Sequence, residues 1–102
     1  MVLFHVTYTA LPGKAEEFLQ AVREEGLLET IRKEDGCLGY DYYLSWEQPD
    51  QILLVERWRD SQAQKTHLAA PHMARLGELK GRYIGETRVW SCLLYTSPSP
   101  RD

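Results

Sequence analysis

Cysteine and long apolar runs are scarce in this sequence, and each shortage excludes a class of protein. Two cysteines, Cys37 and Cys92, are too few for a disulfide framework or a CxxC zinc site, and we expect both as small buried hydrophobic residues. No apolar stretch approaches the roughly 20 residues of a membrane span. No basic run accompanies the net charge of −3. Neither a membrane nor a nucleic acid is therefore an expected partner.

The composition that remains is typical of one globular domain. The chain has 102 residues, of which 43% are hydrophobic and 26% are charged. Its first residues, MVLFHVTYTALPGK, lack the basic segment and cleavage site of a secretory signal, which predicts a cytoplasmic protein. The last residues, SCLLYTSPSPRD, are rich in serine and proline, are expected to be disordered, and resemble a translated sequencing adapter. We expect a domain over residues 1–90 and treat residues 91–102 as a doubtful tail.

Four segments are predicted to be strands. Val2–Ala10 alternates with a period of two and ends at Pro12-Gly13; one face of it would carry Val2, Phe4, Val6 and Tyr8. Residues 37–46 and 51–59 flank a turn at 47–50 and predict a hairpin. One face of the returning strand would carry Ile52, Leu54, Glu56 and Trp58. Residues 84–90 predict the last strand, and whether the tail extends it is left open.

Two regions between these strands are predicted to be helical. In residues 14–36 the apolar stripe slips in phase at Gly26, so we expect a kink or two short helices there, with Gly36 as the C-cap. Asp60 or Ser61 would cap the next helix, since Gln64 completes a capping-box spacing from Ser61. That helix would end near Ala70, because Pro71 disfavours helical geometry before it and suits the first turn of a new helix.

The predicted order β-α-β-β-α-β is typical of the α+β, ferredoxin-like split βαβ fold. This fold has a four-stranded antiparallel sheet with helices on one face. The strands here are apolar on both faces, as Leu53 and Val55 show opposite Ile52 and Leu54. Because the helices cover one face only, we expect a second copy of the chain to cover the other, giving a homodimer with a sandwich or barrel at its centre.

The same segments carry a resemblance to a known family. The ordered set PGKAEEF, EDGCLGYDYY, LLVERWRDSQAQKTHLAAPHM and the strand after LKGRY covers about residues 2–90. With it the chain resembles the antibiotic biosynthesis monooxygenase superfamily of dimeric α+β barrels, and within it the small quinol-monooxygenase-like members. The resemblance implies one of several activities, because the family holds cofactor-independent monooxygenases of quinols and anthrones, haem-degrading enzymes and isomerase-like members.

Metal and haem are two alternatives for the histidine-containing segment THLAAPHM. On a single helix, His67 and His72 would lie about 140° apart, and no acidic residue or cysteine near them in sequence completes a ligand set, so we predict no metal site. The haem-degrading members use an asparagine, a tryptophan and a histidine ligand. The corresponding positions here fall at Val6 and near His67 and Gly77, and the sequence contains no asparagine. We therefore expect no cofactor.

Acid–base chemistry is the third alternative and the one we favour. In the cofactor-free oxygenases of this family a base removes a proton from a phenolic substrate, and the resulting anion passes an electron to O2. His67 or His72 could be that base, with Glu56 as its orienter or as an alternative base. The substrate pocket would be lined by Trp58, Phe4, Val6, Tyr8 and Met73. Each histidine could equally be a structural residue at a helix junction, and Glu56 could simply pair with Arg75 or Arg82.

The sequence therefore predicts a cofactor-independent monooxygenase that oxidises a quinol, anthrone or related phenolic compound with O2. Two alternatives stay open: a non-catalytic dimeric domain that binds a small ligand, and an isomerase or lyase on the same scaffold.

Overall fold

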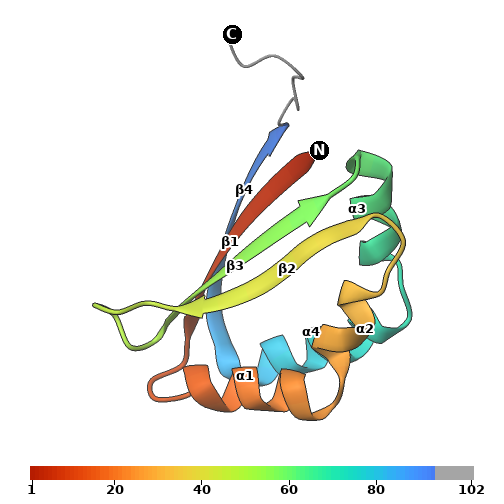
Figure 1. Cartoon of the computed structure of the whole chain (residues 1–102). Helices are drawn as coiled ribbons and strands as arrows, with labels where there is room; N and C mark the ends of the chain where they lie inside the picture. The colour runs from red at the N-terminus through yellow and green to blue at the C-terminus, as the bar shows by residue number, and fades with distance from the viewer. Residues whose placement is uncertain (94–102) are drawn as a thin grey trace, which may run out of the picture.

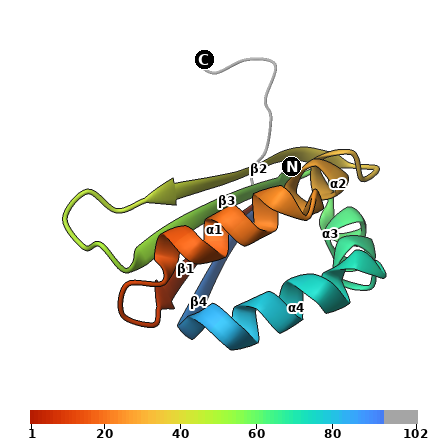
Figure 2. The ribbon, with the colours of Figure 1, turned by 90° about the horizontal axis from the view of Figure 1, so that it is seen from below.

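The computed structural model describes residues 1–93 as a single antiparallel sheet with helices on one of its faces (Figures 1 and 2). The elements in chain order are β1 (Val2–Ala10), α1 (Ala15–Glu24), α2 (Leu27–Arg32), β2 (Cys37–Leu44), β3 (Gln51–Trp58), α3 (Ser61–Leu68), α4 (His72–Tyr83) and β4 (Ile84–Leu93). The strand order β2-β3-β1-β4 places the first and third strands at the centre. This confirms the predicted ferredoxin-like α+β fold. No helix within residues 1–93 combines the length and apolar character that a membrane span needs.

Glycine and aspartate decide where the helices break and begin. Gly26 has a φ of 72° and separates α1 from α2, so the predicted break is confirmed. Gly36 was predicted as the C-cap of α2, and this prediction is wrong, because the helix ends four residues earlier. It turns the chain into β2 with a φ of 84°, where a Cβ atom would lie 2.5 Å from that of Ala63. Asp60, rather than Ser61, caps α3 by accepting a hydrogen bond from the Ala63 amide at 2.8 Å.

The core lies between the sheet and the helices. Phe18 of α1 is fully buried and packs edge-on against three aromatic rings, those of Tyr8, Tyr42 and Tyr83. The helix face of β3 is buried at all four predicted positions, Ile52, Leu54, Glu56 and Trp58. The pairing of β2 with β3 puts Tyr40 and Tyr42 on this same face and Tyr43 on the other, which the sequence had left open.

The strand β4 extends into the tail, which the sequence had left open. It runs to Leu93, three residues beyond Trp90, and stays paired with the first half of β1. Cys92 lies on this extension and is exposed, and Cys37 is half-buried, so the expectation of two buried cysteines is wrong. The disorder predicted for the tail concerns mainly residues 94–102, which lie outside the described residues.

The second face of the sheet is uncovered in a single chain (Figure 2). The strand pairing places Leu3 and His5 of β1, Leu53 and Val55 of β3, and Trp90 of β4 on it. His5 is exposed, and 75% of the Trp90 surface is accessible. Part of this face forms a hollow of about 370 Å³ between β1, β3 and β4.

Candidate functional site

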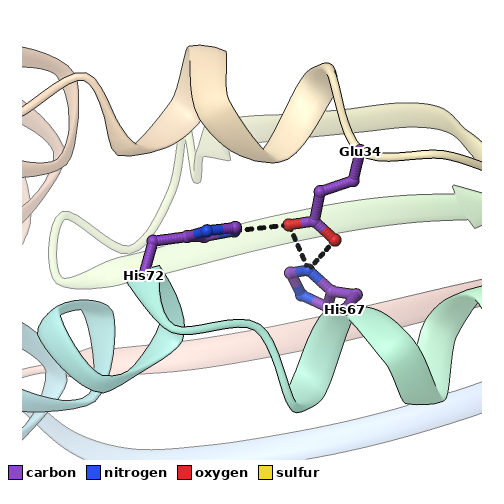
Figure 3. A group of neighbouring side chains, drawn as sticks. All are labelled: Glu34, His67 and His72. Carbon is purple, nitrogen blue, oxygen red and sulfur yellow. Dashed lines mark hydrogen bonds and ion pairs between the residues drawn. The ribbon is translucent and has the colours of Figure 1, made fainter.

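A carboxylate lies between both histidines of the THLAAPHM segment (Figure 3). The Nδ1 atom of His67 is 3.0 Å from each carboxylate oxygen of Glu34, and the Nε2 atom of His72 is 2.6 Å from Glu34 Oε2. The side chain of His67 is 1% exposed, that of Glu34 14% and that of His72 22%. The three groups thus form a cluster, Glu34–His67–His72, that reaches from the core to the surface.

Three separate elements bring this cluster together. Glu34 lies in the turn between α2 and β2, His67 in the last turn of α3, and His72 at the start of α4. Because β2 pairs with β3 from Cys37↔Trp58 onward, the turn before β2 lies beside the start of α3. The helix is interrupted before Pro71, so the two histidines lie on different helices, α3 and α4. The 140° separation predicted for a single helix therefore does not apply. Both imidazoles turn toward Glu34 instead.

The hydrogen bonds fix which ring nitrogens carry hydrogen. An ionised carboxylate only accepts hydrogen bonds, so Nδ1 of His67 and Nε2 of His72 are the donors. In the neutral imidazoles, the free lone pairs are then on Nε2 of His67 and on Nδ1 of His72. Glu34 therefore orients both rings and sets their tautomers.

Two aromatic rings hold His67 in place. Its ring centroid is 4.6 Å from that of Trp58, at an interplanar angle of 34°, and 5.6 Å from that of Tyr40. Trp58 and Tyr40 are 0% and 1% exposed. This packing leaves the His67 ring little freedom to rotate away from Glu34.

Glu56 is buried beside the cluster but belongs to a different hydrogen bond. Its Oε1 atom accepts a hydrogen bond from Trp58 Nε1 at 2.9 Å. Burial raises the pKa of the Glu56 carboxyl, while the Trp58 hydrogen bond and the nearby His67 partly oppose the rise. The arginines that could have paired with Glu56 lie elsewhere, since Arg75 binds Glu25 and Glu78 and Arg82 lies over the ring of Tyr83.

The residues predicted to line a substrate pocket lie in or against the core. Val6, Tyr8 and Trp58 are buried, and Phe4 and Met73 pack against them while partly buried. Burial raises the pKa of the Tyr8 hydroxyl far above its ordinary value, so this group is a neutral donor and not a base. A cleft of about 330 Å³ lies between α1, α2 and β2 and is lined by Leu19, Val22, Arg23, Leu28, Glu29, Arg32 and Tyr42, whose ring packs edge-on against that of Tyr40.

Comparison with known proteins assigns the chain to a family. A family model described as antibiotic biosynthesis monooxygenase matches residues 1–78. The chain belongs to this family. All three members of the Glu34–His67–His72 cluster lie within the matched region.

Relatives in the family carry provisional names. Rv0793 of Mycobacterium tuberculosis and YcnE of Bacillus subtilis are each provisionally named a monooxygenase. Rv0793 is 34% identical over 67 residues, which are 62% of this chain and 65% of that protein. YcnE is 28% identical over 72 residues, which are 71% of this chain and 74% of that protein. The chain spans 59% of the length of a third relative, an uncharacterised Synechocystis protein to which it is 28% identical over 89 residues, or 76% of this chain.

Solved structures of family members share the whole fold. A Deinococcus radiodurans protein, provisionally assigned to the same family, superposes with a TM-score of 0.83 at 25% identity and covers 97% of each chain. The structure of Rv0793 superposes with a TM-score of 0.78 at 25% identity, over 96% of this chain and 98% of that one.

Glu34 is the residue that sequence reasoning missed. It lies 33 positions before His67, within the charged run Lys33-Glu34-Asp35 that is typical of a solvated turn. The signal that could have found it is the hairpin. A turn that leads into β2 must lie beside the helix that follows β3, because the two strands are antiparallel neighbours.

Proposed function

We propose that this family member is a monooxygenase in which His72 removes a proton from a phenolic substrate and the resulting anion reacts with O2. The family membership and the relatives' names support an oxygenase. The Glu34–His67–His72 cluster supports the base, because an imidazole held by a carboxylate is a recurrent proton acceptor in enzymes. The observation that carries the proposal is the hydrogen bond from His72 Nε2 to Glu34, which leaves the Nδ1 lone pair free.

The structure favours His72 over His67 as the base. His72 is 22% exposed and can meet a substrate, whereas His67 is 1% exposed and is enclosed by Trp58 and Tyr40. His67 then serves as a positioning residue that holds the Glu34 carboxylate against His72. Glu56 holds the indole of Trp58 by a hydrogen bond, and Trp58 packs on the imidazole of His67. Glu56 therefore helps to position His67 indirectly.

The proposed reaction needs no electron carrier other than the substrate. His72 takes a proton from an anthrone- or quinol-type compound, and the electron-rich anion gives one electron to O2. The two radicals combine to a peroxide anion, which takes the proton back from His72. Loss of the second hydrogen from the same carbon then forms the C=O bond as the O–O bond breaks and water leaves. For an anthrone, a CH2 group and O2 become a C=O group and H2O, so that atoms and electrons balance. The protein supplies the base and its orientation.

Oxygen uptake tests the proposal. The purified protein is incubated with a panel of anthrones and quinols, with a chelator present and no flavin, haem or metal added, and O2 consumption is compared with autoxidation. We expect uptake above autoxidation that falls by about 10²–10⁴-fold in His72→Ala, the usual contribution of a general base. Asp35→Ala, which removes the exposed carboxylate next to Glu34, is the control and should retain full activity. Uptake that is unchanged in His72→Ala would refute the assignment of the base.

A non-catalytic ligand-binding domain is a second candidate, and the packed core favours it. Trp58 and Tyr40, whose rings enclose that of His67, are 0% and 1% exposed, so side chains of the core fill the space around this imidazole. The cleft between α1, α2 and β2, about 330 Å³, is within the size range of small-ligand sites. Saturable binding of a phenolic compound without O2 uptake would support this candidate instead.

We also propose that the functional unit is a homodimer formed through the uncovered face of the sheet. Leu3, Leu53, Val55, Tyr43 and Trp90 give this face an apolar character that a second copy would bury. Light scattering on the full chain should give twice the monomer mass, and Leu53→Asp should shift it to that of a monomer. A monomeric wild-type protein would contradict this proposal.

A further inference from the structure

The donor atoms of the Glu34–His67–His72 cluster lie close enough to share one ion. His67 Nδ1, His72 Nε2 and a carboxylate oxygen of Glu34 all lie within 4.8 Å of one another. The two histidine–carboxylate distances are 3.0 Å and 2.6 Å. Ligands at about 2.0–2.2 Å from a tetrahedral metal ion lie roughly 3.4 Å apart, so the two contacts of Glu34 would lengthen by about 0.4 Å and about 0.8 Å to admit an ion.

We propose that Glu34, His67 and His72 form a binding site for one divalent transition-metal ion of the zinc class. Two imidazoles and a carboxylate are ligands that suit zinc, iron and nickel rather than calcium or magnesium. Three protein ligands leave a fourth position for water, as in open zinc sites. The exposed edge of His72 and Glu34 gives an ion a path to the site from solvent.

The rings can present lone pairs to an ion by changing tautomer. Each neutral imidazole can hold its hydrogen on either nitrogen, so an ion at the centre of the cluster moves the hydrogens to His67 Nε2 and His72 Nδ1. The site then changes from one negative charge to one positive charge. Trp58 and Tyr40, which enclose the ring of His67, fix the direction of its Nδ1 lone pair as outer-shell partners do in metal sites.

This inference goes beyond the proposed function, although it concerns the same side chains. Metal binding is measured without substrate, so its result does not depend on the proposed function. Where the proposed function also holds, a bound ion places the His72 hydrogen on Nδ1, the nitrogen that would take the substrate proton. Zinc should then inhibit O2 uptake at one equivalent per chain. This one consequence rests on the proposed function.

Titration with Zn²⁺ and Co²⁺ tests the site. The full chain is freed of metal with a chelator, and zinc affinity is measured by calorimetry and by the rise in the unfolding temperature. The visible bands of Co²⁺ report the ligand set. Glu34→Gln keeps the shape of the side chain and removes its charge, and His72→Ala removes a partly exposed ligand. His5→Ala removes the one histidine outside the cluster, and a Cys37→Ser/Cys92→Ser double variant removes both thiols, so these two are the matched controls.

The expected result is one ion per chain in the wild type and in both controls. Glu34→Gln and His72→Ala should each weaken zinc binding by more than the roughly 10–100-fold loss that outer-shell changes cause, while both keep the wild-type circular dichroism. Absence of zinc binding in the wild type would overturn the proposal, and so would equal binding by the cluster variants. Zinc binding without O2 uptake on any substrate would leave this site in place and remove the proposed function.

Discussion

Removing the carboxylate of Glu34 should destabilise the fold far more than removing the carboxylate next to it. In Glu34→Ala, His67 Nδ1 loses its acceptor while its side chain stays 1% exposed. A hydrogen bond to a charged group contributes about 1.5–3 kcal/mol, and leaving a buried donor unsatisfied has a cost of similar size. His72 is 22% exposed and can form a hydrogen bond with water instead, so the loss of its bond to Glu34 adds little to the destabilisation. We expect a loss of about 2–3 kcal/mol in the free energy of unfolding.

Thermal and chemical denaturation measure this loss. For a domain of this size, the expected change corresponds to a fall of roughly 8–24 °C in the unfolding midpoint. Asp35→Ala is the control, because Asp35 is the adjacent residue, is 90% exposed and pairs with Arg59 at the surface. Glu34→Gln should fall between the two, since an amide keeps one acceptor for His67. Equal midpoints for Glu34→Ala and Asp35→Ala would refute the reasoning, because they would show that water replaces the carboxylate at no cost.

Three further changes test the core and the turns. Because burial raises the pKa of Glu56, the folded chain holds this proton to a higher pH than the unfolded chain, so stability falls as pH rises above the ordinary carboxyl value of 4.5. Glu56→Gln should remove that fall in urea titrations made across this pH range, and an unchanged slope would contradict the assignment. Gly36→Ala should lower the free energy of unfolding by about 1–3 kcal/mol, because φ is +84° and the new Cβ would collide with Ala63. Urea unfolding at one pH measures this loss. Gly77 lies in an exposed turn of α4 with open space around it, so Gly77→Ala should raise the free energy of unfolding by about 0.5–1 kcal/mol in the same assay. A Gly36→Ala variant more stable than Gly77→Ala would contradict this account of the local geometry.

The secondary structure could be predicted because its signals are local. The period-two alternation of β1 and β3, the phase slip at Gly26 and the break at Pro71 each depend on residues a few positions apart. The ends of elements were less well predicted. Gly36 was predicted as the C-cap of α2 but lies four residues past the end of that helix. The end of β4 was left open, because it is decided by pairing with β1, which local sequence does not record.

The sequence by itself determined a split βαβ sheet with helices on one face, and it singled out the two histidines as the residues to watch. Only the tertiary structure decided what those histidines contact. The pairing of β2 with β3 carries Glu34 across 33 positions to His67, and the break at Pro71 turns His72 onto the same carboxylate. The reason is physical: periodicity records which face of an element is buried, whereas a contact between distant side chains depends on how the elements pack.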